Sequence, residues 1–157
     1  MHWMILPFKR YAEFSGRSRR MEFWMFQLLN IIVAIVLAGP FMFALFGALA
    51  ADPGSMGMSE EEIVMAAFSG VGGIMLGLYG IYILASLIPS IAVTVRRFHD
   101  RDMSGWWYLG LFLAGLLPLV GWIASIALLV FMLLPGTPGP NRFGEDPKDP
   151  LSTSVFE

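Results

Sequence analysis

Three long stretches of this chain contain no charged residue, and this property limits most strongly how the chain can fold. The stretches cover residues 23–51, 63–95 and 103–141. Each is longer than the roughly 20 apolar residues that a helix needs to cross a bilayer. The pattern therefore predicts an all-α integral membrane protein with its polar segments at the membrane surfaces.

The composition agrees with one membrane domain over residues 1–147, followed by a disordered tail at 148–157. Of the 157 residues, 57% are hydrophobic and 14% are charged, whereas soluble domains have about 25% charged residues. The absence of cysteine excludes disulfides, thiolate metal sites and cysteine nucleophiles. With only two histidines, a histidine metal site is also disfavoured, so we expect no metal and no cofactor.

The apolar stretches and their flanking residues predict the following elements. An aromatic and basic segment at residues 1–17 is expected to lie at the headgroup level. Helices are expected at about 21–46 and 60–88, and a last apolar element at about 104–134. The protein is therefore predicted to have three to four transmembrane helices, with the last apolar element kinked or hairpin-like at Pro118.

The last apolar element is expected to break in its middle. As a single helix, the segment from Trp106 to Leu134 would be about 43 Å long, against a hydrocarbon core of about 30 Å. Pro118 lies between Gly115 and Gly121, and these residue types favour a break. We favour a shallow hairpin over a single crossing.

The start of the helix at 60–88 carries a capping signature. Ser59 is followed three residues later by Glu62, the spacing at which each side chain satisfies a backbone amide of the other residue.

The distribution of basic residues predicts the orientation. Lys and Arg number five before the first helix, none in the acidic loop 52–62, three between 96 and 101, and two in the tail. Because basic loops stay in the cytoplasm, the N-terminus and the 96–101 loop are predicted to be cytoplasmic and the acidic loop to be outside. A hairpin would also place the C-terminus in the cytoplasm; a single crossing would place it outside.

Three polar motifs carry a resemblance to a known family. They are Phe14-Ser-Gly-Arg-Ser-Arg-Arg-Met-Glu-Phe-Trp24, then Arg96-Arg-Phe-His-Asp100 with Ser104-Gly-Trp-Trp107, and finally the Pro- and Gly-rich run 135–144 with Asp146-Pro147. In order and character they resemble the YhaH/YhaI-like family of small bacterial inner-membrane proteins, a domain of unknown function (DUF805). The resemblance covers about residues 8–147. It implies a multi-pass inner-membrane location and no established activity.

The polar motifs suggest a cationic rim at the cytoplasmic surface. Each basic residue near an anionic leaflet contributes about 1 kcal/mol, and guanidinium groups form paired hydrogen bonds with phosphate. Two interpretations of this rim are open. It could simply anchor the protein at the membrane surface, or it could form a specific site for anionic phospholipid headgroups in which Glu22 and Asp100 orient the arginines. The candidate residues are Arg17, Arg19, Arg20, Glu22, Arg96, Arg97, His99, Asp100, Asn141 and Arg142.

A stripe of small residues predicts a helix-packing face. Ser69, Gly73 and Gly77 recur every four residues, which permits close approach of a second helix. A membrane scaffold or accessory protein would use this face for a partner helix or for a homo-oligomer. The hydroxyl groups between Tyr79 and Thr94 suggest the alternative, an oligomeric transport component, although such hydroxyls more often bond to their own helix backbone.

Two further functions are disfavoured. An enzyme would depend on His99 beside Asp100, but adjacent residues of a helix do not face each other, so no catalytic residue is assigned. Nucleic-acid binding is disfavoured because the chain has a net charge of −2 and its few basic residues lie near the membrane.

Overall fold

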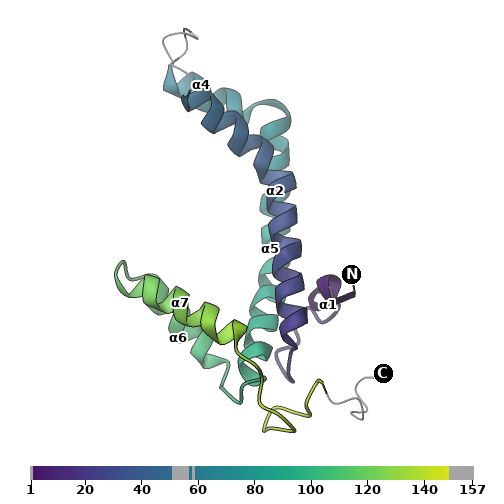
Figure 1. Ribbon diagram of the computed structural model, residues 1–157. Helices are drawn as coiled ribbons and strands as arrows, with labels where there is room; N and C mark the ends of the chain where they lie inside the picture. Colours follow the sequence, from purple (N-terminus) through teal and green to yellow (C-terminus); the bar gives the residue numbers. More distant parts are fainter. Residues whose placement is uncertain (1, 51–56, 58, 149–157) are drawn as a thin grey trace. The chain divides into compact units, whose positions relative to one another are not determined.

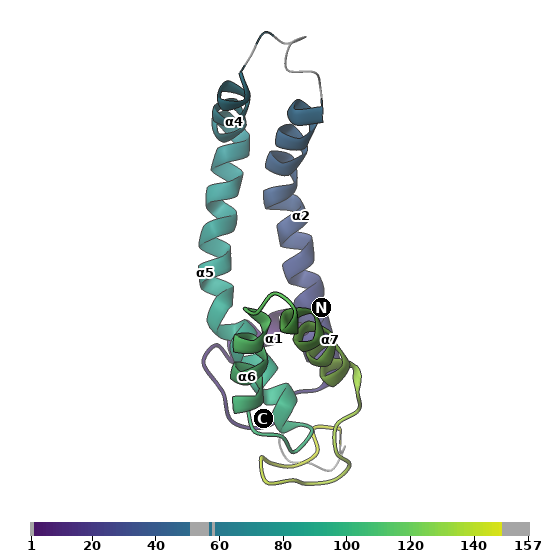
Figure 2. The same ribbon diagram turned by 90° about the vertical axis from the view of Figure 1, so that its left-hand side faces the viewer.

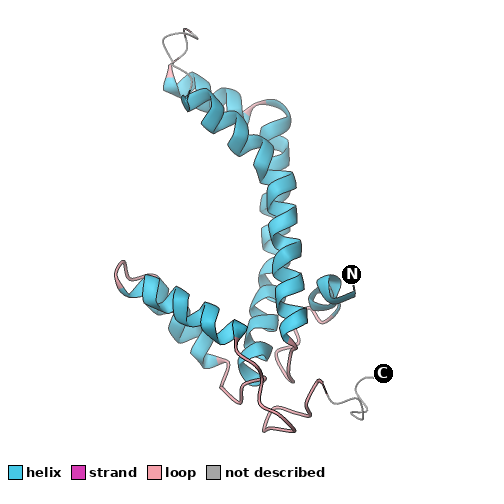
Figure 3. Ribbon diagram, viewed as in Figure 1, coloured by secondary structure: helices cyan, strands magenta, loops and turns pink. Residues whose placement is uncertain are grey.

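The computed structural model describes residues 2–50, 57 and 59–148, and all regular elements in these residues are helices (Figures 1 and 3). This confirms the all-α prediction. Most of the loop expected at residues 50–58 lies outside the described residues. So does the tail that was expected to be disordered, apart from Lys148. The helices are α1 (His2–Lys9), α2 (Arg20–Ala50), α4 (Glu60–Phe68), α5 (Gly70–His99), α6 (Trp106–Gly115) and α7 (Val120–Leu133).

Two of these helices are long and apolar enough to cross a membrane. Arg20–Ala48 and Gly70–His99 have mean hydropathies of 2.5 and 2.0 in their most apolar windows, and only 6% of each window is buried. Their large apolar side chains point outward, with Ile35 66%, Phe43 83% and Leu84 71% exposed. Apolar surface of this extent marks a face that contacts lipid or another protein rather than water.

The capping box predicted at the start of α4 is confirmed. The amide of Glu62 donates to Ser59 Oγ over 3.3 Å, and the amide of Ser59 donates to Glu62 Oε2 over 2.7 Å. Two first-turn amides that lack partners within the helix are satisfied in this way.

The chain direction changes at Ser69, which interrupts the expected stripe of small residues. Ser69 caps the C-terminus of α4 in an extended conformation, and Gly70 adopts a φ of +73° that suits glycine. Ser69 therefore lies outside the helix that holds Gly73 and Gly77, and the continuous face expected from the sequence is not formed.

Helix α5 continues through Pro89 to His99, beyond the end near residue 88 expected from the sequence. A proline inside a helix removes one backbone hydrogen bond. Beyond Pro89, however, Ala92, Val93 and Phe98 are 0% exposed. Their burial stabilises the last turns of the helix.

The described chain forms two compact units, one of residues 28–86 and one of residues 1–27 with 87–157. In the first of these, α2 and α5 run alongside each other (Figure 2). The Tyr82 hydroxyl donates to Asn30 Oδ1 over 2.6 Å, as expected for a polar amide inside an apolar helix. The rings of Phe41 and Phe68 are 4.9 Å apart.

In the other unit, α6 and α7 pack side by side and are joined through residues 116–119 (Figures 1 and 2). Gly121 allows this approach, because a Cβ at that position would lie 2.6 Å from the carbonyl oxygen of Gly115. The connecting residues are apolar and outward-facing, with Leu119 87% exposed. The ring of Phe98 at the end of α5 lies 5.7 Å from the ring of Phe131, which joins α7 to the core of this unit.

Candidate functional site

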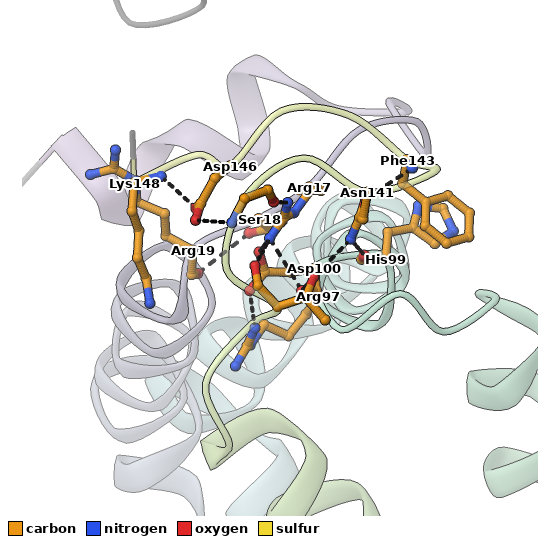
Figure 4. Close-up of polar contacts among 12 residues, drawn as sticks. Arg17, Ser18, Arg19, Arg97, His99, Asp100, Asn141, Phe143, Asp146 and Lys148 are labelled. Carbon is orange, nitrogen blue, oxygen red and sulfur yellow. Dashed lines mark hydrogen bonds and ion pairs between the residues drawn. The ribbon is translucent and has the colours of Figure 1, made fainter. Parts of the chain in front are cut away.

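All three polar motifs meet around the carboxylate of Asp100, which follows the last residue of α5 (Figure 4). Asp100 Oδ1 accepts a hydrogen bond from Arg17 Nε at 3.1 Å and lies 3.0 Å from Arg17 Nη2. Its Oδ2 accepts from Arg97 Nη1. The backbone carbonyl of Asp100 accepts from the amide of Thr137 at 2.8 Å. We call the group Arg17, Arg97, Asp100, Thr137 and Asn141 the polar clasp.

Arg17 connects all three motifs through one guanidinium group. Besides its pair with Asp100, it donates to the carbonyl oxygens of Thr137 and Gly139, each at 2.6 Å. Gly16, immediately before it, has a φ of +78°, so the chain turns sharply between α1 and α2. A planar, multidentate donor suits this position, where a lysine would supply a single point charge.

Arg97 fixes the C-terminus of α7 to the end of α5. Its guanidinium donates to the carbonyl of Leu134, the residue that caps α7, and pairs with Asp100. The last carbonyl groups of a helix lack partners within the helix and attract cations. The ion pair and the cap thus share one buried side chain.

A second buried pair lies beside the clasp and joins α2 to α5. Arg96 Nη2 donates to Glu22 Oε1 at 2.8 Å, and the Ser18 hydroxyl donates to the other carboxylate oxygen, also at 2.8 Å. The amide of Ser18 donates to the carbonyl of Arg96 at 3.2 Å. Glu22 is therefore held between Ser18 and Arg96.

Glu13 adds a third carboxylate at the edge of this pair. Its Oε2 lies 3.8 Å from Arg96 Nη1, and its side chain is 41% exposed. Arg10 forms two hydrogen bonds of 2.7 Å with Glu13, and this contact lowers the pKa of Glu13 below its ordinary value.

Burial separates the arginines into two groups. Within the described residues, the buried charged side chains are three guanidinium groups, from Arg17, Arg96 and Arg97, and two carboxylates, from Glu22 and Asp100. Each of them has a charged partner, as burial of a charge requires. The three arginines are therefore buried and paired inside the protein.

The other arginines of the expected rim lie outside the clasp. Arg142 is 60% exposed and pairs with Asp102 at 3.1 Å. Arg20 is exposed and donates to the carbonyl of Leu133 at 3.2 Å. Arg19 lies over the ring of Trp3, 5.6 Å from its centroid.

His99 and Asn141 hold the C-terminal motif against the end of α5. Asn141 Nδ2 donates to the carbonyl of His99 at 2.9 Å and to Thr137 Oγ1 at 3.1 Å. The ring of Phe143 stacks on His99 with centroids 3.9 Å apart, and His99 Nδ1 lies 3.2 Å from the carbonyl of Gly16. His99 and Asp100 thus engage different partners.

Several residues of the site were absent from the sequence-based set. Thr137 and Gly139 contribute mainly backbone groups, and Gly136 is needed because a Cβ there would overlap the Asp100 carboxylate. Asp146 accepts from the amide of Gly139 at 3.1 Å, and a hydrogen bond from the Lys148 amide lowers the pKa of Asp146. The density of proline and glycine in this motif signals turns, but no sequence signal identifies which carbonyls receive the arginines.

No group of His, Cys, Asp and Glu residues suited to a metal ion occurs in the part of the chain that the structure describes.

Comparison with known proteins shows that the chain is similar to a family of proteins. A family model described as "Protein of unknown function (DUF805)" matches residues 11–145. The chain is 39% identical to Inner membrane protein YhaH of Escherichia coli K12 over 148 residues, which cover 94% of this chain and 98% of that protein. It is 35% identical to Inner membrane protein YhaI of the same strain, with coverage of 94% and 97%. No solved structure matches the chain.

Proposed function

The chain belongs to the DUF805 family of proteins of unknown function, and from this premise we propose that it is a multi-pass inner-membrane protein that serves as a scaffold or accessory subunit. The names of the relatives YhaH and YhaI support the location. The length and the outward-facing apolar side chains of α2 and α5 support their role as spans.

We propose that α6 and α7 enter the membrane shallowly and return to the same side. The helices have 10 and 14 residues, or about 15 and 21 Å, which is short of the roughly 30 Å hydrocarbon core. The hydrogen bond between Thr137 and Asp100 also brings the chain after α7 back to the chain before α6. With the basic residues inside, the N-terminus, the clasp and the C-terminus are cytoplasmic.

The polar clasp has a structural role in this proposal. The observation that carries it is the carboxylate of Asp100, which is shared by two buried arginines from separate motifs. The clasp closes the cytoplasmic end by tying the segment before α2 and the chain after α7 to α5. Contact with anionic headgroups is then left to exposed cations, including Lys9, Arg20 and Arg142.

The partner surface that we propose lies on α5. Apart from the neighbouring residues and backbone of α5 itself, no described atom lies within 4 Å of a Cβ built at Gly77 or Gly80, so a second helix can approach the backbone closely there. A cysteine at Gly77 tests this surface, since the chain has no other cysteine. In native membranes we expect the Gly77→Cys variant to form a disulfide-linked homodimer or to crosslink to a second protein. The control is a cysteine at an exposed position of α7, such as Ile126. Crosslinking from Gly77 that is no more efficient than from Ile126 would contradict the proposed surface.

Reporter fusions test the topology. Alkaline phosphatase, which is active only in the periplasm, should be active when inserted in the acidic loop 52–62 and inactive after residue 157. Strong activity at the C-terminus would contradict the hairpin, and activity at neither position would contradict the multi-pass arrangement.

A further inference from the structure

A cavity of about 570 Å³ lies between the last turns of α5 and the start of α6. Its volume is within the range of about 300–1,000 Å³ typical of small-molecule sites. Its walls are mainly aliphatic and aromatic side chains, among them Ile91 of α5 and Leu109 and Phe112 of α6. The arginines of the clasp do not line it, so it is distinct from the buried ion pairs.

The α5 wall of the cavity is about as long as one membrane leaflet is deep. Its α5 wall consists of Leu87, Ile91, Val95 and His99, which recur every four residues and so lie on one face of the helix. From Leu87 to His99 the helix rises about 18 Å. One leaflet of a hydrocarbon core about 30 Å thick is about 15 Å deep.

The polar groups of the lining gather toward one end. His99 and Ser104 flank the charged turn between α5 and α6, and the opposite end is formed by Leu87 and Phe112. The lining residues include no charged side chain. A charged group held inside would therefore be uncompensated, whereas the ester or hydroxyl groups of a glycerol backbone could hydrogen-bond at the polar end.

The cavity also opens onto apolar surface. Leu87, Leu109 and Phe112 line it, yet they remain 50%, 43% and 55% exposed. In the membrane location proposed above, this opening faces the acyl chains of the bilayer.

We propose that the cavity is a binding site for one acyl chain of a glycerolipid, with the glycerol ester at His99 and Ser104 and the headgroup outside. This inference rests on the proposed membrane location. The axial match to one leaflet, the apolar walls and the neutral polar end together favour this occupant over a free anion or a water-soluble ligand.

Photolabelling in nanodiscs tests the site. The probe is a phosphatidylglycerol with a diazirine midway along one acyl chain, diluted in phosphatidylcholine, and labelled peptides are identified by mass spectrometry. We expect labelling of the α5 and α6 cavity walls above that of the exposed apolar surface of α7. Ile91→Trp, which fills the cavity, should lower the wall labelling about tenfold, the change that corresponds to about 1.4 kcal/mol of lost affinity.

Two further variants control the experiment. Leu109→Trp fills the cavity from its other wall and should give the same loss, which guards against a folding defect in Ile91→Trp. Ile126→Trp, on α7 and 60% exposed, should leave the wall labelling unchanged. Undiminished wall labelling in both filling variants would overturn the site.

Two readouts separate the site from the assumptions behind it. Labelling of the exposed face of α2 reports that the protein is embedded in the membrane. If α2 is not labelled, the proposed function is contradicted. If α2 is labelled but the cavity walls are labelled no more than other surfaces, only the acyl-chain site is contradicted. Unlabelled diacylglycerol and phosphatidylglycerol should both compete for the walls. Competition by phosphatidylglycerol alone would assign binding to the headgroup and overturn the proposal.

Discussion

Arg17 and Asp100 form a buried ion pair with 3.0 Å between Nη2 and Oδ1, although 83 positions separate them in the sequence. Both side chains are only 2% exposed. Asp100 also forms an ion pair with Arg97, so two buried guanidinium groups share one carboxylate. The contacts that secure the end of α5 are therefore long-range and electrostatic as well as apolar.

Asp100→Asn should strongly destabilise the protein. The substitution leaves two arginines without their carboxylate partner, and loss of one partner of a buried pair costs about 3–5 kcal/mol. The free energy of unfolding in mixed detergent micelles measures the effect. The matched control is Asp102→Asn, since Asp102 is 48% exposed and pairs with the exposed Arg142; its cost should stay below about 1 kcal/mol. Equal losses in the two variants would contradict a buried clasp.

Gly136→Ala should lower stability by about 1–3 kcal/mol, the usual cost of overpacking. The new Cβ would overlap the carboxylate of Asp100 and push the C-terminal motif away from α5. Gly110→Ala in α6 is the comparison, because outside the backbone of its own helix no described atom lies within 4 Å of a Cβ at Gly110 and alanine favours a helix. Thermal unfolding of both variants should show a loss only for Gly136→Ala; a stable Gly136→Ala protein would argue against the observed approach.

The contact of Glu13 with Arg10 and Arg96 should make stability depend on acid pH. The folded-state pKa of Glu13 is lowered, first by its hydrogen bond with Arg10, from an ordinary value of 4.5. A carboxylate with a lowered pKa contributes stability above its ordinary pKa, and this contribution is lost as the pH falls through the lowered value. Melting temperatures below pH 4.5 should fall less steeply in Glu13→Gln than in the wild type. Parallel pH profiles would show that this contact contributes nothing.

Exposed cations, rather than clasp arginines, should govern the preference for anionic lipid. Lys9→Gln with Arg20→Gln should weaken association with spin-labelled phosphatidylglycerol by about 2 kcal/mol, at about 1 kcal/mol for each charge. Electron paramagnetic resonance of the reconstituted protein measures the association. Glu61→Gln, in the acidic segment predicted to lie on the opposite side, should have little effect. An unchanged preference in the double variant would remove these two residues from the headgroup surface.

Local sequence signals were sufficient for the helical framework. Charge-free runs indicated the apolar helices because a helix satisfies its own backbone hydrogen bonds, and the Ser59–Glu62 spacing predicted a cap that depends on four consecutive residues. The continuation of α5 beyond Pro89 was missed, because burial of Phe98 and its neighbours outweighs a local helix breaker.

The sequence did not indicate which arginine side chains are buried and which are exposed. Arg17 and Arg20 lie three residues apart in the same basic motif, yet the first is buried and the second is exposed. A charge count treats them alike, and the difference arises from carbonyl groups of Thr137 and Gly139 more than a hundred residues away. The sequence motifs thus suggested that these segments lie on one side of the membrane, but they did not indicate which side chains form the contacts between them.

A double-mutant cycle on Arg17 and Asp100 tests the clasp most directly. The free energy of unfolding is measured for Arg17→Gln, Asp100→Asn, the double variant and the wild type in the same micelles. Residues in direct contact show coupling energies of about 0.5–3 kcal/mol, and a buried pair should fall in the upper part of that range, with the double variant less destabilised than the sum of the single variants. Additive effects within about 0.3–0.5 kcal/mol, as for distant sites, would contradict the clasp.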